Sequence, residues 1–481
     1  MNLAEYARHD GIGLAELVRK KEVTPRELCE LALAGIAKVN PRLNCVIQTF
    51  PERVAALDYV RLPDGPFRGV PFLIKDLFMY EKGVLSEGGS QLMQGMVADH
   101  DSELMTRFRR AGFVNLGRTT SPEMGYSSTT SSRLGGLTRN PWDPERISGG
   151  SSGGSAVAVA AGIVPIAHGS DGGGSIRSPS CFNGTVGLKP TRNRISEAPD
   201  GGEPLMGMAV NFAITRTVRD CAATLEAVAG PVPGDPNIVP PPARAFLSEV
   251  GAAPGRLRVA YTTKTFSGVP IATEIIAAVE RTADVLRRLG HDVREAMPTF
   301  DWPDFNVANN VIWTTNVAHS CDALGRRLGR TPSLENLQRT TWACYEFGKR
   351  CTATQLLGAL DVFNTVTRRF GAFFEDHDVF LAPTCTKLAE PHAVYDADQA
   401  GMDAMAWTEL LFALEVFLVP FNVTGQPGIS LPLHQTDQGA QIGMHFAARF
   451  GDEATLFRLA GVLEKELPWR DRRPPIHVAA R

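Results

Sequence analysis

Short apolar runs and longer amphipathic stretches alternate in the N-terminal part of the chain. The apolar runs at 45–49, 69–76 and 114–117 have the length of buried strands. The stretches 14–20 and 103–111 carry their apolar residues on one helical face, which predicts amphipathic helices. This alternation of strands and helices predicts an α/β sheet.

A capping signal marks another helix near the N-terminus. Thr24 has the residue type of an N-cap, Pro25 suits the first helical position, and Glu27 is the acidic residue that completes a capping box. Apolar positions continue to Ile36. We expect this helix to end before the pair Asn40-Pro41, because proline disrupts a helix interior.

The same alternation continues to the C-terminal part of the chain. Amphipathic stretches predict helices at 218–228, 273–289 and 453–467 and a mainly helical segment at 305–375, whereas apolar runs predict strands at 257–261, 291–293, 378–383, 428–433 and 442–447. The proline-rich connection 231–242 does not interrupt this alternation. We therefore expect one α/β domain over residues 1–481.

Composition and charge exclude several classes of protein. Of the 481 residues, 43% are hydrophobic and 21% are charged, which is typical of a globular chain and excludes a disordered one. The formal net charge of −3, without a Lys/Arg cluster, argues against a nucleic-acid-binding protein. No apolar run reaches membrane-spanning length and no signal-peptide pattern is evident, so we expect a cytoplasmic protein without membrane contact. The eight cysteines lack C-x-x-C spacing, which predicts reduced thiols and no metal site.

Two glycine-rich turns, at 149–154 and 172–177, each contain serine. Glycine permits positive φ and lets consecutive backbone N–H groups approach an anionic ligand. A serine hydroxyl beside such N–H groups can attack a carbonyl, and the N–H groups can stabilise the resulting oxyanion. The pattern therefore favours acyl transfer.

A segment of small apolar residues separates the two turns. Residues 155–162 predict a buried helix that begins near Ser152 and has Ser151 at its N-terminus; residues 163–167 predict a strand, and residues 168–171 a turn. A flexible Gly/Ser linker would contain neither a helix nor a strand. The two turns therefore belong to a folded unit.

Three chemistries compete for these turns. The missing lysine of the G-x-x-x-x-G-K-[ST] pattern in both turns argues against a phosphate-binding loop. Residues 149–153 match the G-x-S-x-G elbow of α/β-hydrolases, but the two prolines in 140–146 exclude the buried strand that must precede it. The third chemistry uses Lys75 as the base for the two serines, although a lysine at a strand end is more often a surface residue.

Several segments together resemble the amidase signature family. The resemblance rests on GVPFLIKD at 69–76, TRNPWD at 138–143, the serine turns within 149–190, and the C-terminal segments 378–383 and 419–427. It covers nearly the whole chain, with residues 69–200 as the signature core. It implies a single α/β/α domain with a central mixed β-sheet covered by helices, and a site without metal or cofactor.

The resemblance assigns catalytic roles to three residues. Ser175 matches the nucleophile that accepts the acyl group, Ser151 matches the bridging serine that follows a cis peptide bond, and Lys75 matches the general base. In this arrangement a proton passes from Ser175 to Ser151 and from Ser151 to Lys75, and this relay needs a neutral lysine. The pKa of a lysine is ordinarily about 10.4, and burial beside hydroxyls lowers it. The expected oxyanion hole consists of the backbone N–H groups of Ser175, Gly172, Gly173 and Gly174.

Four neighbouring residues are interpreted as structural support. Asp171 and Arg177 flank the nucleophile and are expected to form an ion pair that holds the turn. Ser152 can form a hydrogen bond near the catalytic residues or cap the following helix, and we expect the cap because it is the simpler role. His168 is expected to be a packed histidine, because the relay leaves it no proton to carry.

Four further residues are candidates for substrate binding. Ser128 and Thr129 match the family's loop beside the substrate carbonyl. The chain looks most like the family's 6-aminohexanoate cyclic dimer (nylon-oligomer) hydrolases, but Tyr126 and Trp313 stand where these place Asn and Cys against the substrate. A more aromatic pocket favours a small-molecule substrate that is an extended apolar or aryl amide, or a carbamate (urethane) with the same planar carbonyl.

Other functions share these motifs. One is a hydrolase of the cyclic nylon-oligomer dimer, and another is the glutamine-hydrolysing A subunit of a tRNA-dependent amidotransferase. Glu415 lies near where that subunit binds the amino group of its substrate, but no arginine partner is evident. A binding protein with an inactive site is disfavoured by the intact Lys75, Ser151 and Ser175. The oligomeric state, including a homodimer, stays open.

Overall fold

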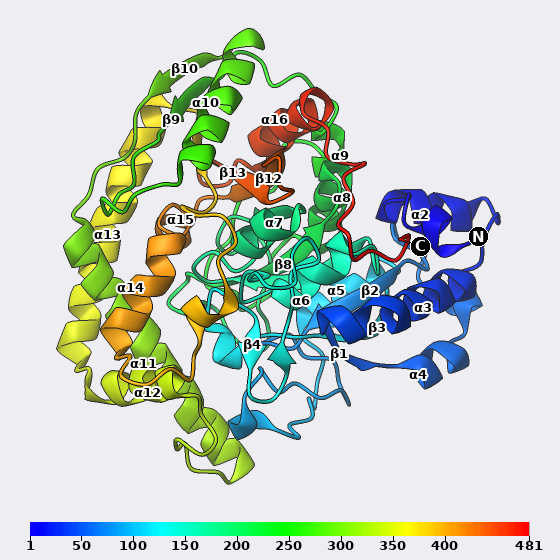
Figure 1. Ribbon diagram of the computed structural model, residues 1–481, viewed down its shortest axis with the longest axis horizontal. Helices are drawn as coiled ribbons and strands as arrows, with labels where there is room; N and C mark the ends of the chain where they lie inside the picture. Colours follow the sequence, from blue (N-terminus) through cyan, green and yellow to red (C-terminus); the bar gives the residue numbers. More distant parts are fainter. Residues whose placement is uncertain (481) are drawn as a thin grey trace.

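An 11-stranded mixed sheet runs through the computed structural model, which describes residues 1–480 (Figure 1). The strand order is β1-β3-β2-β6-β8-β7-β12-β13-β11-β9-β10. A separate two-stranded sheet pairs β4 (Ser131–Ser132) with β5 (Gly136–Leu137). The large sheet contains β1 (Val46–Thr49), β2 (Pro71–Lys75), β3 (Val114–Thr119), β6 (Ile166–Asp171), β7 (Val186–Lys189), β8 (Val210–Thr215), β9 (Arg258–Tyr261), β10 (Asp292–Glu295), β11 (Val379–Pro383), β12 (Gly428–Gln435) and β13 (Gln441–Ala448).

Both strand directions occur in the large sheet. Strand β2 runs parallel to β3 and β6, and β9 runs parallel to β10 and β11. The pairs formed by β6, β7, β8, β12 and β13 in the middle of the sheet are antiparallel. Every residue of β2, β7, β8, β11 and β13 is buried, as expected for strands covered on both faces. The predicted mixed sheet covered by helices is confirmed.

Helices flank this sheet and also form a second layer. Their bounds are α1 (Leu3–Tyr6), α2 (Gly11–Arg19), α3 (Pro25–Leu43), α4 (Pro51–Ala56), α5 (Glu103–Arg110), α6 (Gly153–Ala160), α7 (Arg177–Asn183), α8 (Val218–Val228), α9 (Phe246–Glu249), α10 (Thr273–Arg288), α11 (Trp302–Leu328), α12 (Arg339–Arg350), α13 (Ala353–Asp376), α14 (Ala404–Leu414), α15 (Val419–Thr424) and α16 (Glu453–Glu466). The layer made by α11 to α14 lies on the side opposite the two chain ends (Figure 1). Short 3₁₀ turns occur at η1 (Tyr59–Arg61), η2 (Gln91–Met93), η3 (Glu123–Gly125) and η4 (His392–Tyr395).

Helix α3 begins as predicted and ends later than predicted. The Thr24–Glu27 capping box is present, but the helix continues through Pro41 to Leu43. Pro41 has no backbone N–H and therefore removes one helical hydrogen bond in the last turn of α3. The turn still closes, because the Asn44 N–H bonds to the Asn40 carbonyl at 2.8 Å. The prediction that the helix ends before residue 40 was therefore wrong.

Strand β6 begins later than predicted and includes the segment expected to turn. Residues Ile166 to Asp171 pair with β8, with Ile166 opposite Thr215 and Asp171 opposite Val210. The Ile163 N–H instead bonds to the Ala158 carbonyl and closes the turn that follows α6. Pairing with a distant strand thus decided the boundary, and it places Asp171 at the strand end, directly before the second glycine turn.

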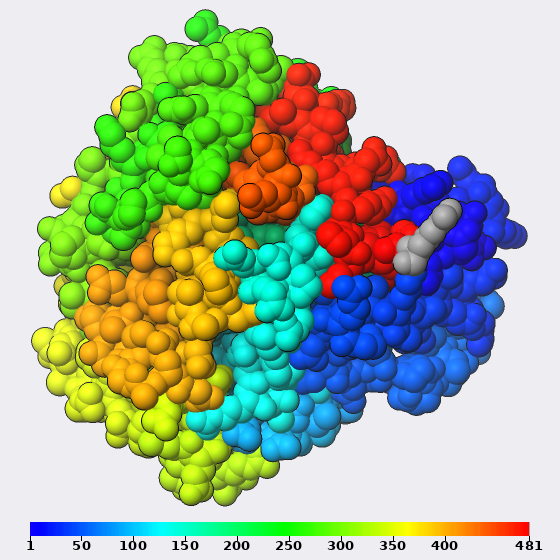
Figure 2. Space-filling model, in the orientation of Figure 1, coloured from blue at the N-terminus to red at the C-terminus, as the bar shows by residue number. Residues whose placement is uncertain are grey.

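The two ends of the chain lie against each other. Figure 2 shows the C-terminal segment in contact with the N-terminal helices. The Lys38 Nζ donates to the Val478 carbonyl at 2.9 Å, and the Trp469 indole donates to the Arg216 carbonyl at 3.0 Å. All eight cysteines are free thiols within residues 1–480, and seven of them are buried. Among the described helices, none has the length and apolar content to cross a membrane.

Candidate active site

Strands β2 and β6 bring the lysine and the two glycine turns together. These strands are parallel neighbours, with Leu73 beside Ala167. Lys75 is the last residue of β2, and the second glycine turn follows the end of β6. The first turn leads into α6, and its Ser152 N–H donates to the carbonyl of Ser175 in the second turn at 3.2 Å. The sheet thus joins segments that are about a hundred residues apart in sequence.

Lys75 is fully buried among hydroxyl groups. Its Nζ lies 2.7 Å from the Ser151 Oγ, 2.8 Å from the Ser170 Oγ and 3.0 Å from the Ser152 Oγ. Burial lowers the pKa of Lys75 from 10.5 to about 7, and the negative charge of Asp171 acts in the opposite direction. Lys75 forms no ion pair with any carboxylate in the described part of the chain. A substantial neutral fraction therefore exists at neutral pH.

When Lys75 is neutral, its three hydroxyl contacts require one hydroxyl to donate to the amine. A neutral amine has two N–H donors and one lone pair, so it satisfies three hydroxyl contacts only by accepting once. The Ser152 hydroxyl donates to the Ser170 carbonyl at 3.1 Å, so its proton is already engaged. The donor to Lys75 is therefore Ser151 or Ser170.

The Ser152 side chain forms a hydrogen bond with Lys75 and does not cap helix α6. It is the N-cap residue of α6, but its side chain makes no capping hydrogen bond. The Oγ instead accepts from the Ser170 N–H at 3.2 Å and contacts Lys75. The prediction that Ser152 caps the helix was wrong, because the buried amine and the β6 backbone take up this hydroxyl.

Ser175 lies on the wall of a cavity, next to backbone N–H groups. It is 8% exposed and lines the cavity together with Ser151, Ser170 and Gly172. Within residues 1–480, no protein acceptor pairs with the amide N–H groups of the segment 172–175. These donors are available to an oxyanion. The peptide bond between Gly150 and Ser151 is cis.

The second turn has no room for side chains on its glycines. Gly174 has a φ of 145°. A Cβ there would lie 2.8 Å from Leu418 Cδ1 and 2.9 Å from Glu415 Oε2, and a Cβ on Gly173 would lie 2.7 Å from Phe412 Cε1. Side chains from α14 and the segment that follows it therefore pack directly against the second glycine turn. Glycine is required here both for backbone conformation and for space.

A buried ion pair closes the turn, as predicted. The Arg177 guanidinium donates to Asp171 through Nε at 2.9 Å and through Nη2 at 3.0 Å. The Ile176 N–H donates to the same carboxylate at 3.2 Å, and the Asn422 Nδ2 does so at 2.9 Å. These donors hold the pKa of Asp171 well below its ordinary value. Asn422 was not singled out from the sequence, although the segment 419–427 contains it.

His168 packs inside β6 and stays neutral. Its Nδ1 accepts the Lys75 backbone N–H at 3.2 Å, so Nε2 carries the proton and donates to the Asn211 Oδ1 at 3.1 Å. Burial lowers the pKa of His168 to about 3. It therefore orients the backbone of Lys75 and has no proton to exchange near neutral pH.

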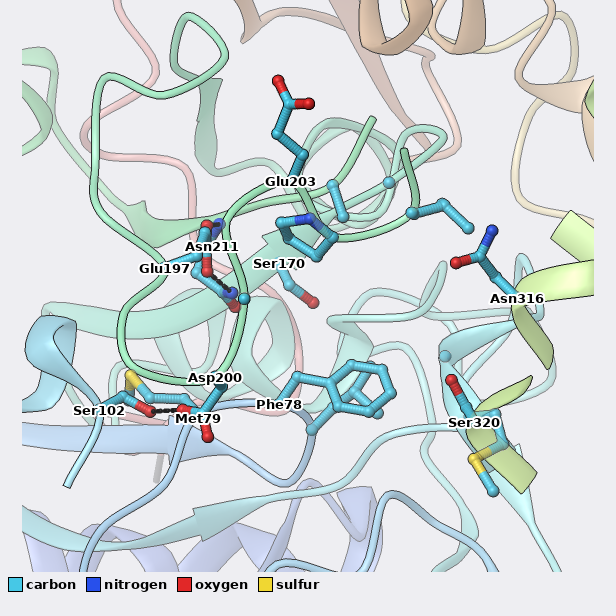
Figure 3. Close-up of a pocket in the computed structure, with 18 of the residues that line it drawn as sticks. Phe78, Met79, Ser102, Ser170, Glu197, Asp200, Glu203, Asn211, Asn316 and Ser320 are labelled. Carbon is cyan, nitrogen blue, oxygen red and sulfur yellow. Dashed lines mark hydrogen bonds between the residues drawn. The ribbon is translucent and has the colours of Figure 1, made fainter. Parts of the chain in front are cut away.

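The cavity beside Ser175 has a volume of about 500 Å³. Its walls come from the loop after β2, from the loop between β7 and β8, and from one face of α11, as the labelled residues in Figure 3 show. Apolar lining residues include Phe78, Met79, Leu104, Leu205, Met206, Trp313, Val317 and Leu324. This size and mixture are typical of a small-molecule site.

Only one of the four predicted substrate-binding residues reaches this cavity. Trp313 lines it, and Tyr126 lies behind Trp313 with the rings stacked at 4.6 Å and 7°. The Tyr126 hydroxyl lies 2.5 Å from Thr408 Oγ1. Ser128 and Thr129 are 2% exposed and do not line the cavity. The structure therefore places Tyr126, Ser128 and Thr129 in the layer that supports the site.

Two substitutions distinguish Trp313, which lines the cavity, from Tyr126, which packs behind it. Trp313→Ala opens the wall, and we expect it to raise KM for an aryl amide by about 10-fold, since burying a large side chain is worth about 1.5–3 kcal/mol. Tyr126→Phe keeps the stacked ring and removes one hydrogen bond, so it should lower the unfolding free energy by about 1 kcal/mol and leave KM nearly unchanged. Steady-state kinetics and thermal denaturation measure both effects. A larger KM effect for Tyr126→Phe than for Trp313→Ala would place Tyr126 against the substrate.

Several polar wall residues had no signal in the sequence. Glu197, Asn211 and Asn316 all line the cavity. Glu197 lies in the loop between β7 and β8, Asn211 in strand β8 and Asn316 in helix α11. Polar residues are ordinarily found at the protein surface, so their residue types do not indicate a cavity. No local pattern distinguishes them.

Comparison with known proteins identifies the family. Residues 27–457 match the model of the Amidase family. The chain belongs to this family. It is 36% identical to 6-aminohexanoate-cyclic-dimer hydrolase of Paenarthrobacter ureafaciens over 97% of this chain and 96% of that protein. It is 32% identical to an acylamidase of Rhodococcus erythropolis over 96% of each.

Solved amidase structures share the fold. A 6-aminohexanoate cyclic dimer hydrolase complexed with substrate superimposes with a TM-score of 0.93 at 35% identity, over 98% of this chain and 99% of that one. The family membership and the fold together establish the chain as a hydrolase of amide bonds.

Proposed function

We propose that this amidase cleaves amides through a covalent acyl-enzyme in which Ser175 is the nucleophile, Ser151 the bridging serine and Lys75 the base. One observation supports this assignment above all others. The amine of Lys75 is fully buried, has a lowered pKa, and lies 2.7 Å from the hydroxyl of Ser151, which shares the cavity wall with Ser175.

The proposed reaction moves two protons in each direction. Lys75 accepts the proton of Ser151, Ser151 accepts that of Ser175, and the Ser175 Oγ bonds to the substrate carbonyl carbon. The carbonyl electron pair moves onto oxygen, where the N–H groups of 172–175 stabilise the oxyanion by about 2.7–4 kcal/mol per donor. The protons return through the same path to the departing amine as the C–N bond breaks. Water then attacks the acyl-enzyme by the same route and releases the carboxylic acid.

The proposed substrates are apolar or aryl amides, with carbamates as a second class. The cavity walls consist largely of aromatic and aliphatic side chains, which favour an apolar chain or ring beside the scissile carbonyl. A carbamate presents the same planar carbonyl to the nucleophile.

A substrate panel tests this proposal. The panel contains a p-nitroanilide, a linear alkyl amide, the 6-aminohexanoate cyclic dimer, glutamine and a urethane. We expect the anilide and the linear amide to have the highest kcat/KM and to transfer their acyl group to added hydroxylamine, as an acyl-enzyme requires. Faster hydrolysis of the cyclic dimer than of every anilide and urethane would overturn the proposed substrate class. Glutamine as the best substrate would instead indicate the amidotransferase subunit.

Glu415 gives no support to glutamine hydrolysis. It is 4% exposed, lies behind Gly174 and does not line the cavity. Burial raises the pKa of Glu415 to about 8, so it is largely protonated at neutral pH. A neutral carboxylic acid outside the cavity does not bind the amino group of a glutamine substrate.

A further inference from the structure

The loop between β7 and β8 gives the cavity an acidic wall. Three carboxylate residues of this loop, Glu197, Asp200 and Glu203, line the cavity. The lining contains no lysine or arginine among the described residues. The opposite wall, from α11, combines apolar residues with the polar residues Asn316, His319 and Ser320. Electrostatics therefore favour a ligand with positive charge at the acidic side.

Two of the three carboxylates have other partners. Asp200 Oδ1 lies 2.8 Å from the His100 Nε2, and its Oδ2 accepts the Ser102 hydroxyl at 3.1 Å. Glu203 accepts from the Asn237 Nδ2 at 2.9 Å, and Figure 3 shows its side chain pointing away from Ser170 and Phe78. Both residues are also exposed, so solvent completes the interactions of their carboxylates.

Glu197 differs because it is partly buried and has no cationic partner. Its two carboxylate oxygens accept the Asn211 N–H at 2.9 Å and the Asn211 Nδ2 at 2.6 Å. No lysine, arginine or histidine of residues 1–480 lies within ion-pair distance of it. A carboxylate accepts about four hydrogen bonds, so about two sites remain free on the cavity side.

The surroundings of Glu197 hold it rigidly but do not neutralise it. The Asn211 side chain is fixed from the other side by His168, which is neutral. Burial raises the pKa of Glu197 to about 7 against the hydrogen bonds from Asn211, and the carboxylates of Asp200 and Asp235 add to the increase. The protein groups around Glu197 therefore stabilise its negative charge poorly, and a cation beside it would stabilise that charge.

A second acceptor lies across the cavity. The Asn316 Nδ2 donates to the Ile312 carbonyl within α11 at 2.8 Å, which leaves Oδ1 free to accept. Figure 3 shows Asn316 on the side of the cavity opposite Glu197 and Asn211. Both walls thus offer acceptors, separated by apolar surface. This arrangement suits an apolar chain that carries N–H donors.

We infer that Glu197 binds an ammonium group of the substrate, so that the preferred amides carry a primary amine at the end of an apolar chain. An ammonium group has three donors and supplies the positive charge that Glu197 lacks. This inference rests on the proposed function, because it specifies the substrate of the same cavity.

Matched substrates that differ only in charge test the inference. The first pair is 6-aminohexanoyl p-nitroanilide and heptanoyl p-nitroanilide, in which a methyl group replaces the ammonium on the acyl side. The second pair, N-(6-aminohexyl)benzamide and N-heptylbenzamide, places the charge on the amine side. In at least one pair at pH 8, we expect the cationic member to have a kcat/KM about 10-fold or more above the neutral one. Glu197→Gln should abolish that preference.

The pH dependence of this preference has a definite sign. Binding needs the ionised carboxylate, so the cationic-to-neutral ratio of kcat/KM should rise as pH increases from 6 to 8. Titration of Lys75 changes kcat/KM of both substrates by the same factor, so this factor drops out of the ratio. In Glu197→Gln the ratio should not vary with pH.

Control variants separate charge recognition from folding. Glu203→Gln removes a charge from the same wall and should keep the preference, and Glu197→Asp should keep part of it. Equal rates within both pairs, faster hydrolysis of the neutral members, or an unchanged preference in a folded Glu197→Gln variant would overturn the inference. Cleavage of the neutral anilide that depends on Ser175 would leave the proposed function intact in each of these cases. Ser175-independent cleavage would overturn the proposed function itself.

Discussion

Ser175→Ala is expected to reduce kcat for amide hydrolysis by about 10⁴-fold or more, because it removes the side chain proposed to form the acyl-enzyme. The substitution deletes one oxygen from a residue at the cavity wall, so the fold and the unfolding temperature should change little. Steady-state hydrolysis of an anilide measures the loss. Intact-mass spectrometry after treatment with a serine-directed fluorophosphonate should show one label on the wild type and none on the variant.

Ser248→Ala is the matched control for this substitution. Ser248 lies in α9, away from the cavity lining, and is exposed. The Ser248→Ala variant should hydrolyse the anilide at the wild-type rate and take up one fluorophosphonate label. Retention of labelling by Ser175→Ala, or only a small loss of rate in a folded protein, would contradict the role assigned to Ser175.

Lys75→Met is expected to lower kcat/KM by about 10³-fold or more, because removal of a general base acts on every proton transfer in the relay. In the wild type, kcat/KM should rise as pH increases through about 7, since only the neutral amine accepts a proton and the pKa of Lys75 is about 7. The residual activity of the variant should lack this rise. A pH–rate profile from pH 5.5 to 9 checks both statements, and an unchanged rise in Lys75→Met would assign it to another group.

Stability provides a readout of Lys75 that does not depend on activity. The lysine pKa is 10.5 in the unfolded chain and about 7 in the fold, so between these values the unfolded state binds one more proton. Wild-type stability relative to Lys75→Met should therefore rise with pH, by roughly 1.4 kcal/mol per unit between pH 7.5 and 9.5. Urea denaturation across this range measures the difference. A difference that does not vary with pH would show that Lys75 keeps its proton in the fold.

Local patterns predicted many of the helices and strands and the two serine turns, whereas the family resemblance assigned the catalytic roles. The capping box at Thr24 and Glu27 marked the start of α3, and helix α8 was predicted with its observed bounds. The sequence did not predict the end of α3 or the start of β6. The first depends on how the last turn tolerates Pro41, and the second on pairing between β6 and β8. Both are outcomes of contacts that a local pattern does not contain.

The sequence by itself determined which chemistry-bearing residues exist and how their turns can fold: Lys75 closes an apolar strand, and the glycines of 172–174 allow a turn without side chains. The tertiary structure alone decided that Lys75 lies in a cage of three hydroxyls, that Ser152 serves the amine and not the helix, that Tyr126 stands behind Trp313, and that Glu197 faces the cavity without a counter-ion. The physical reason is that side-chain pKa values and cavity walls depend on burial and on neighbours that are distant in sequence, whereas helix caps, strand runs and glycine turns depend on adjacent residues.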